Sequence, residues 1–164
     1  MRILVAISTI VAVTALAGCG KHDTKTYTDS NGNSVAVSNN GDGHMTVTGS
    51  NGEKVEFGSG AAATAKMPSY LPLYPGAKVT TSFTGSGKDG AGGMVAFQVA
   101  ASAADVVSFY KAKATSAGLA QTMSAEMGDT TTYVAANEKT KHTVSVSATK
   151  GSDGTTVQIT WSEK

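Results

Sequence analysis

Apolar and polar side chains alternate strictly over a stretch near the start of the chain. From Tyr27 to Phe57, apolar side chains recur at every second position, with Ser, Thr or Glu between them. A period of two is typical of strands that bury one face. Asn-Gly and Asp-Gly pairs interrupt the pattern about every ten residues, and such pairs tolerate the positive φ angles of tight hairpins. We therefore expect a small antiparallel β-meander over residues 27–57, which is too thin to be stable without packing on another part.

Two segments of unusual composition follow the meander. Residues 58–66 are mostly small and read as a linker. All three prolines then lie between Pro68 and Pro75, which forbids a helix and predicts an extended strap. Four large side chains of this strap are too apolar to remain in water: Tyr70, Leu71, Leu73 and Tyr74. We expect the strap to cover the protein's own core, and the alternative is a ligand for a partner protein.

Only one segment has a convincing helical pattern, at 102–118. Ser102 is a suitable N-cap and Asp105 its reciprocal partner, while Gly118 is the expected stop. Helical spacing relates the side chains of its apolar stripe, with Lys113 at the edge: Val106, Val107, Phe109, Tyr110, Ala114 and Ala117.

Strand patterns surround this helix. They cover 78–84, 93–100, 119–125, 131–136, 143–149 and 155–161, and we expect the glycine-rich stretch 85–92 to be a flexible hairpin loop. The fold class predicted for residues 67–164 is α+β: a mainly antiparallel sheet with one main helix on one face, preceded by the meander.

The first eighteen residues have the features of an export signal. Arg2 is followed by an apolar run that ends in small residues, and the run is short for a membrane span. The sole cysteine of the chain comes directly after it, in Leu16-Ala17-Gly18-Cys19. An ordinary signal peptide with a chance cysteine is the alternative reading.

Leu16-Ala17-Gly18-Cys19 resembles the lipobox of bacterial lipoproteins at all four positions. The resemblance implies cleavage between Gly18 and Cys19 and attachment of diacylglyceryl to the Cys19 thiol, usually with acylation of the new N-terminus. Several acyl chains on one residue give stable anchoring. Residues 19–26 would then be a short lipidated tether. Gly20 resembles an outer-membrane sorting signal, with the protein facing the periplasm.

A second resemblance concerns the C-terminal part. Tyr74-Pro75-Gly76-Ala77 leads into a strand, and Val106-Val107-Ser108-Phe109-Tyr110 opens the helix. Together they look like a group of small, mostly uncharacterised exported bacterial proteins and lipoproteins, in which a YPGA strap precedes a β-β-α-β domain with a V-x-x-F-Y helix. The resemblance covers residues 67–162 and implies no activity.

Charge and cysteine content narrow the function. A net charge of +1 and a pI of about 7.8 leave no electrostatic footprint for nucleic acid. Loss of Arg2 with the signal makes the mature chain formally neutral, so basic attraction to headgroups would not anchor it. One cysteine allows neither an internal disulfide nor a cysteine-based metal site.

Catalytic and metal-binding patterns are weak. His22, His44 and His142 lack the spacing of a zinc hydrolase, and no Gly-x-Ser-x-Gly elbow occurs. Asp29-x-Asn31-x-Asn33 starts like a calcium loop, but Ser34 and Asn40 occupy the positions that need Gly and Glu, so a hairpin turn is favoured. We expect no catalytic residue, no metal site and no cofactor.

The sequence therefore predicts a lipid-anchored protein of the bacterial cell envelope with a non-catalytic binding or structural module. Its partners would be membrane lipid, through acylated Cys19, and an envelope protein or glycan. Two alternatives stay open: a periplasmic carrier of a small ligand, held between sheet and helix, and a metal-dependent enzyme or binder that uses His44 or His142.

Overall fold

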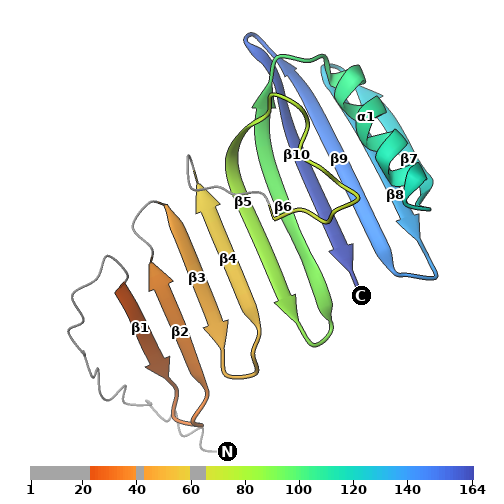
Figure 1. Ribbon diagram of the computed structural model, residues 1–164. Helices are drawn as coiled ribbons and strands as arrows, with labels where there is room; N and C mark the ends of the chain where they lie inside the picture. The colour runs from red at the N-terminus through yellow and green to blue at the C-terminus, as the bar shows by residue number, and fades with distance from the viewer. Residues whose placement is uncertain (1–22, 40–42, 60–65) are drawn as a thin grey trace, which may run out of the picture.

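One antiparallel sheet of ten strands organises the protein. The computed structural model describes residues 23–39, 43–59 and 66–164, and within them neighbouring strands follow the order β1-β2-β3-β4-β5-β6-β10-β9-β8-β7. Figure 1 shows the strands side by side, with the helix lying over the strands at one end of the sheet. Mainly antiparallel strands with one packed helix confirm the α+β fold class.

Four short strands form the N-terminal meander: β1 (Asp23–Thr28), β2 (Ser34–Asn39), β3 (His44–Gly49) and β4 (Lys54–Ser59). The first strand starts earlier than the expected boundary at residue 27, because its residues pair in register with β2 from Asp23↔Asn39 onward. At the β1–β2 turn, Asp29 Oδ1 accepts the backbone N–H groups of Asn31 and Asn33, each at 2.9 Å. The preferred interpretation of this segment as a hairpin turn is confirmed.

The meander continues directly into the rest of the sheet. Strand β4 pairs antiparallel with β5 (Lys78–Gly87), and the rings of Phe57 and Phe83 meet edge to face with centroids 5.2 Å apart. Gly58 and Ser59 belong to β4, so the linker that we expected from residue 58 starts later; residues 60–65 lie outside the described part. The meander thus extends the sheet edge to edge.

The remaining elements are β6 (Gly90–Val99), α1 (Ala103–Ser116), β7 (Ala120–Met127), β8 (Thr130–Asn137), β9 (His142–Gly151) and β10 (Gly154–Glu163). Strands β5 and β6 are longer than expected. The glycine-rich segment is not a loop: its residues pair down to Gly87↔Gly90, which leaves only Lys88 and Asp89 in the turn. At Gly90 and Gly92 a side chain would collide with the backbone of β10, so glycine fits these two positions.

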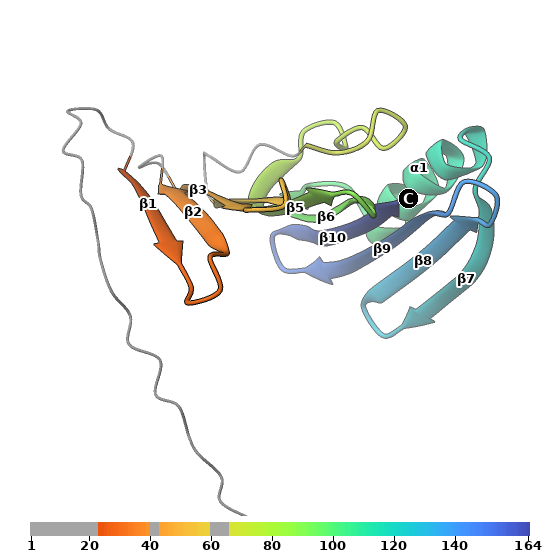
Figure 2. The ribbon, with the colours of Figure 1, turned by 90° about the horizontal axis from the view of Figure 1, so that it is seen from below.

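The core lies on one face of the sheet, beneath α1 and the strap. Figure 2 shows both on the same side. Leu71 of the strap is fully buried, and several neighbouring strap residues pack on the core, so the interpretation of the strap as a cover for the protein's own core is confirmed. The buried sheet residues are Val95, Phe97, Val99, Tyr133, Ala135, Val144, Val146, Ala148, Val157, Ile159 and Trp161.

The N-terminal strands turn their apolar side chains to the other face. The pairing register places Met45, Phe57, Phe83 and Met94 in one row across β3 to β6. Because successive residues of a strand point to opposite faces, Met94 lies on the face opposite Val95, which belongs to the core. The apolar side of the sheet therefore changes between its two halves.

Candidate functional site

A pocket of about 360 Å³ opens between the strap and the sheet, on the same face as α1. Strands β4, β5, β6 and β10 supply its sheet side, and the first residues of the strap supply its cover. Its walls combine charged, small and apolar side chains, including Lys54, Glu56, Lys66, Met67, Trp161 and Glu163.

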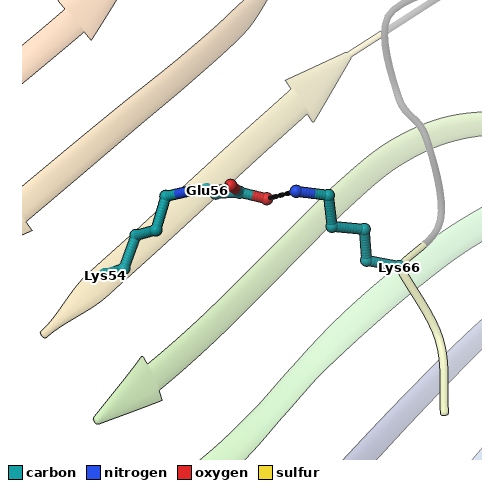
Figure 3. Close-up of polar contacts among 3 residues, drawn as sticks. All are labelled: Lys54, Glu56 and Lys66. Atoms are coloured by element: carbon teal, nitrogen blue, oxygen red, sulfur yellow. Dashed lines mark hydrogen bonds and ion pairs between the residues drawn. The ribbon is translucent and has the colours of Figure 1, made fainter.

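A carboxylate between two lysines forms one wall (Figure 3). Glu56 is only 11% exposed and accepts a hydrogen bond at 2.6 Å from Lys54 Nζ and a second from Lys66 Nζ. Hydrogen bonds from Lys54, and next from Lys66, lower the pKa of Glu56 from 4.5 to about 2. Since Lys66 precedes the strap and Glu56 lies in β4, this contact ties the start of the strap to the meander.

The opposite wall is formed near the C-terminus of β10. Trp161 is almost fully buried and Glu163 lies beside it in the wall. Burial, and then the nearby carboxylate of Glu163, raise the pKa of Tyr70 in the strap to about 12. The ring of Tyr70 is stacked on His142, with centroids 5.7 Å apart.

The buried hydroxyl of Tyr133 has no hydrogen-bond partner among the described residues, whereas that of Tyr70 lies near Glu163 and that of Tyr110 near the backbone of Tyr74. Burial raises the pKa of Tyr110 in α1 and of Tyr133 in β8, so both side chains are neutral. Buried hydroxyls are usually paired. The Tyr133 hydroxyl is therefore a candidate partner for a bound molecule or water on the α1 face of the sheet.

The structure does not bring His44 and His142 close together. His44 begins β3 and His142 begins β9, five strand intervals apart in the sheet order, which is about 24 Å at the usual strand spacing. No group of three or more His, Cys, Asp or Glu side chains suited to a metal occurs in the described part of the chain. His22, Gly18 and Cys19 lie outside the described residues.

Sequence reasoning missed the pocket. Lys54 and Glu56 share one face of β4 because they are two residues apart, and this spacing was available as a signal. Their pairing with Lys66 depends on how the strap returns over the sheet, which no local pattern reports.

The comparisons with known proteins bear on the second part of the chain. A sequence model of the START domain-like family matches residues 78–163, more than half of the chain. The chain belongs to this family. The match begins with the first residue of β5 and ends with the last residue of β10, so β4 and the strap lie outside it. No curated protein and no solved structure matches the chain.

Membership of the START domain-like family points to a ligand-binding module. The strap pocket has walls from inside the matched region, such as Trp161, and from outside it, such as Glu56 and Lys66. Among the residues that the structure describes, no helix is long and apolar enough to cross a membrane.

Proposed function

We propose that the protein is a lipid-anchored protein of the bacterial cell envelope whose START domain-like part binds a small molecule in the strap pocket without catalysing a reaction. The observation that carries the binding function is this pocket, about 360 Å³ in volume and formed jointly by the family domain, β4 and the strap. The size lies at the lower end of ordinary small-molecule sites.

The chemistry of the walls indicates the kind of molecule. Met67, Pro68 and Trp161 offer apolar surface, while Lys54, Glu56 and Lys66 offer charged groups close to it. An amphiphilic small molecule, with one apolar and one polar end, fits this arrangement. The sequence left open a small-ligand carrier with its site between the sheet and the helix, and we now propose the site beneath the strap instead.

Anchoring is proposed from Leu16-Ala17-Gly18-Cys19. The mature chain would begin at Cys19, carry acyl chains on it, and face the periplasm, with Gly20 favouring the outer membrane. Metabolic labelling with an alkyne-bearing palmitate tests this part. Wild-type protein should be labelled and should remain with the membranes. The Cys19→Ala variant should be unlabelled and should not remain with the membranes. A wild-type protein that is membrane-bound but unlabelled would contradict the proposal.

Native mass spectrometry of the protein purified from its own host tests the binding function. Ala91 lines the pocket, so Ala91→Trp fills it, while Ala112→Trp adds the same ring at an exposed position of α1. A retained molecule should appear with wild type and Ala112→Trp and be lost with Ala91→Trp. Absence of any retained molecule, or equal retention in both variants, would contradict the proposed site.

A further inference from the structure

An uncovered apolar surface lies on the face of the sheet that points away from α1 and the strap. It contains partly buried Val37, Val47 and Val55 and more exposed side chains from the first four strands. The most exposed are Tyr27 at 57%, Val35 at 38%, Met45 at 36% and Phe57 at 38%. We refer to these seven residues, with Phe83 and Met94, as the meander face.

The meander face ends in a hollow. Next to Phe57, a depression of about 400 Å³ is lined mainly by Phe83, Gly85, Gly92 and Met94. Beyond β6 the row that contains Met94 continues through polar Thr160 and Ser145, and then reaches Val134 in β8 and Met123 in β7. Polar positions in β10 and β9 therefore separate the apolar surface of β1–β6 from a smaller one at the far end of the sheet, where Met123 is 48% exposed.

A sheet that exposes one apolar face gains stability when a second layer covers it. In this protein α1 and the strap pack on the opposite face, over the C-terminal strands of the sheet, as Figure 2 shows. No other described element is left to cover the meander face, so its cover must come from elsewhere.

We propose that the meander face packs against the same face of a second copy of the chain, so that two sheets form a β-sandwich. Sheets stack in this way at about 10 Å. Charge does not oppose the pairing, because the one lysine on this face, Lys25 in the edge strand, lies 3.8 Å from Asp23. The meander face has both protruding side chains and an adjacent hollow. In a two-fold contact the protruding side chains of each copy can therefore enter the hollow of the other.

The available area is sufficient for a weak dimer. Six strands separated by five intervals of about 4.8 Å, over six residues at about 3.3 Å per residue, give about 480 Å² per copy, or about 1,000 Å² for two. This value is close to the lower limit for a specific interface, about 1,000 Å². Anchoring at Cys19 would raise the local concentration of copies, although the contact itself does not require it.

A lipid surface fits this face less well than a second copy does. The strand β1 is an edge of the sheet, and its outward backbone N–H and C=O groups would lose water in hydrocarbon without gaining partners. In a sandwich the edge stays in water while the apolar face is covered.

Site-specific photo-crosslinking of the full chain in bacterial cells tests the proposal. The photo-reactive analogue benzoylphenylalanine replaces Phe57 on the meander face or, as a matched control, exposed Thr48 on the other face of β3. We expect a product of twice the protein's mass from position 57, about tenfold above the level from position 48.

A second substitution makes the result specific. Met45 is already partly exposed, so Met45→Lys leaves the monomer folded but places a charge in the interface, and the product from position 57 should fall about tenfold. Thr48→Lys should leave it unchanged. A product with lipid, a product with another protein, no product, or a dimer unaffected by Met45→Lys would each overturn the proposal. Labelling at Cys19 is a separate measurement, so failure of anchoring does not imitate any of these results.

Discussion

The indole ring of Trp161 lies against Gly93, where strands β10 and β6 pair. A Cβ atom at Gly93 would come within 2.6 Å of Trp161 Cζ2 and 2.5 Å of the Phe83 carbonyl oxygen. The absence of a side chain at residue 93 therefore allows Trp161 to lie flat at the wall of the strap pocket. A side chain at residue 93 would therefore have to displace both the Trp161 ring and the backbone of Phe83, and backbone moves less readily than the end of a flexible side chain.

Gly93→Ala should lower the free energy of unfolding by about 3 kcal/mol, since over-packing moves the Trp161 ring and the β5 backbone. Urea unfolding followed by Trp161 fluorescence measures it. Gly85→Ala is the matched control: no heavy atom lies within 4 Å of its added Cβ, so its effect should stay within about 0.5 kcal/mol. Equal effects of the two substitutions would contradict the close packing at Gly93.

Glu56 should stabilise the fold only above acidic pH. Its pKa falls from 4.5 to about 2 on folding, so its contribution is present above about pH 4.5 and is lost as the pH falls towards 2. Glu56→Gln should therefore lower the free energy of unfolding by about 1 kcal/mol at pH 7 and by much less at pH 2.5. The effect at pH 7 is modest because solvent screens both lysines, which are largely exposed. Urea unfolding of both proteins at the two pH values measures this.

Glu126→Gln provides the control for that measurement. Glu126 is an exposed residue of β7, and none of the ion pairs among the described residues includes it. The difference between wild type and Glu126→Gln should stay small at both pH values. If Glu56→Gln behaved in the same way, the ion pairs of Figure 3 would not contribute to stability.

Tyr133→Phe should leave the free energy of unfolding unchanged or raise it by up to about 1 kcal/mol. The Tyr133 side chain is 1% exposed and its hydroxyl has no partner among the described residues, so the substitution removes a buried unpaired group and keeps the ring. Tyr133→Ala should lower the free energy of unfolding by about 4 kcal/mol, because it leaves a cavity in the core. A loss above about 1 kcal/mol for Tyr133→Phe would show that the hydroxyl is bonded in solution.

The N-terminus of α1 offers a further test. The Ser102 hydroxyl accepts the Asp105 N–H at 3.1 Å and donates to Asp105 Oδ2 at 2.7 Å. Ser102→Ala should lower the free energy of unfolding, measured by urea unfolding, by about 1 kcal/mol, and Ser102→Asn should largely preserve it. Ser108→Ala, at an exposed position within the helix, should change the stability by less than about 0.5 kcal/mol. Equal effects at residues 102 and 108 would contradict the cap.

Local sequence patterns predicted the local elements. Ser102 and Asp105 indicated the start of α1, Gly118 with φ of 77° follows its end, and the alternation of apolar residues with Ser, Gln and Thr predicted the last two strands. The proline spacing and the apolar side chains of 67–77 predicted a covering strap, with Leu71 inside the core. In each case the determining residues are neighbours in the sequence.

Long-range features were not predictable in the same way. A period of two shows that a strand has an apolar face but not which side of the sheet that face joins, so the change of side between Phe57 and Val95 was invisible. The pairing of β4 with β5 and the contact of Glu56 with Lys66 bring together residues on opposite sides of 60–65. The pocket depends on both, and it was therefore missed.

The pairing of β4 with β5 also determines where the chain can be shortened. The family match begins at residue 78, and trimming to that boundary would turn β5 into a ten-residue free edge whose Phe83 loses its contact with Phe57. Long free edges with apolar neighbours recruit other strands and aggregate. The short strand β1, with three threonines, one lysine and one aspartate among its six residues, is a far safer edge strand. The N-terminal extension thus protects the START domain-like part from uncontrolled self-association.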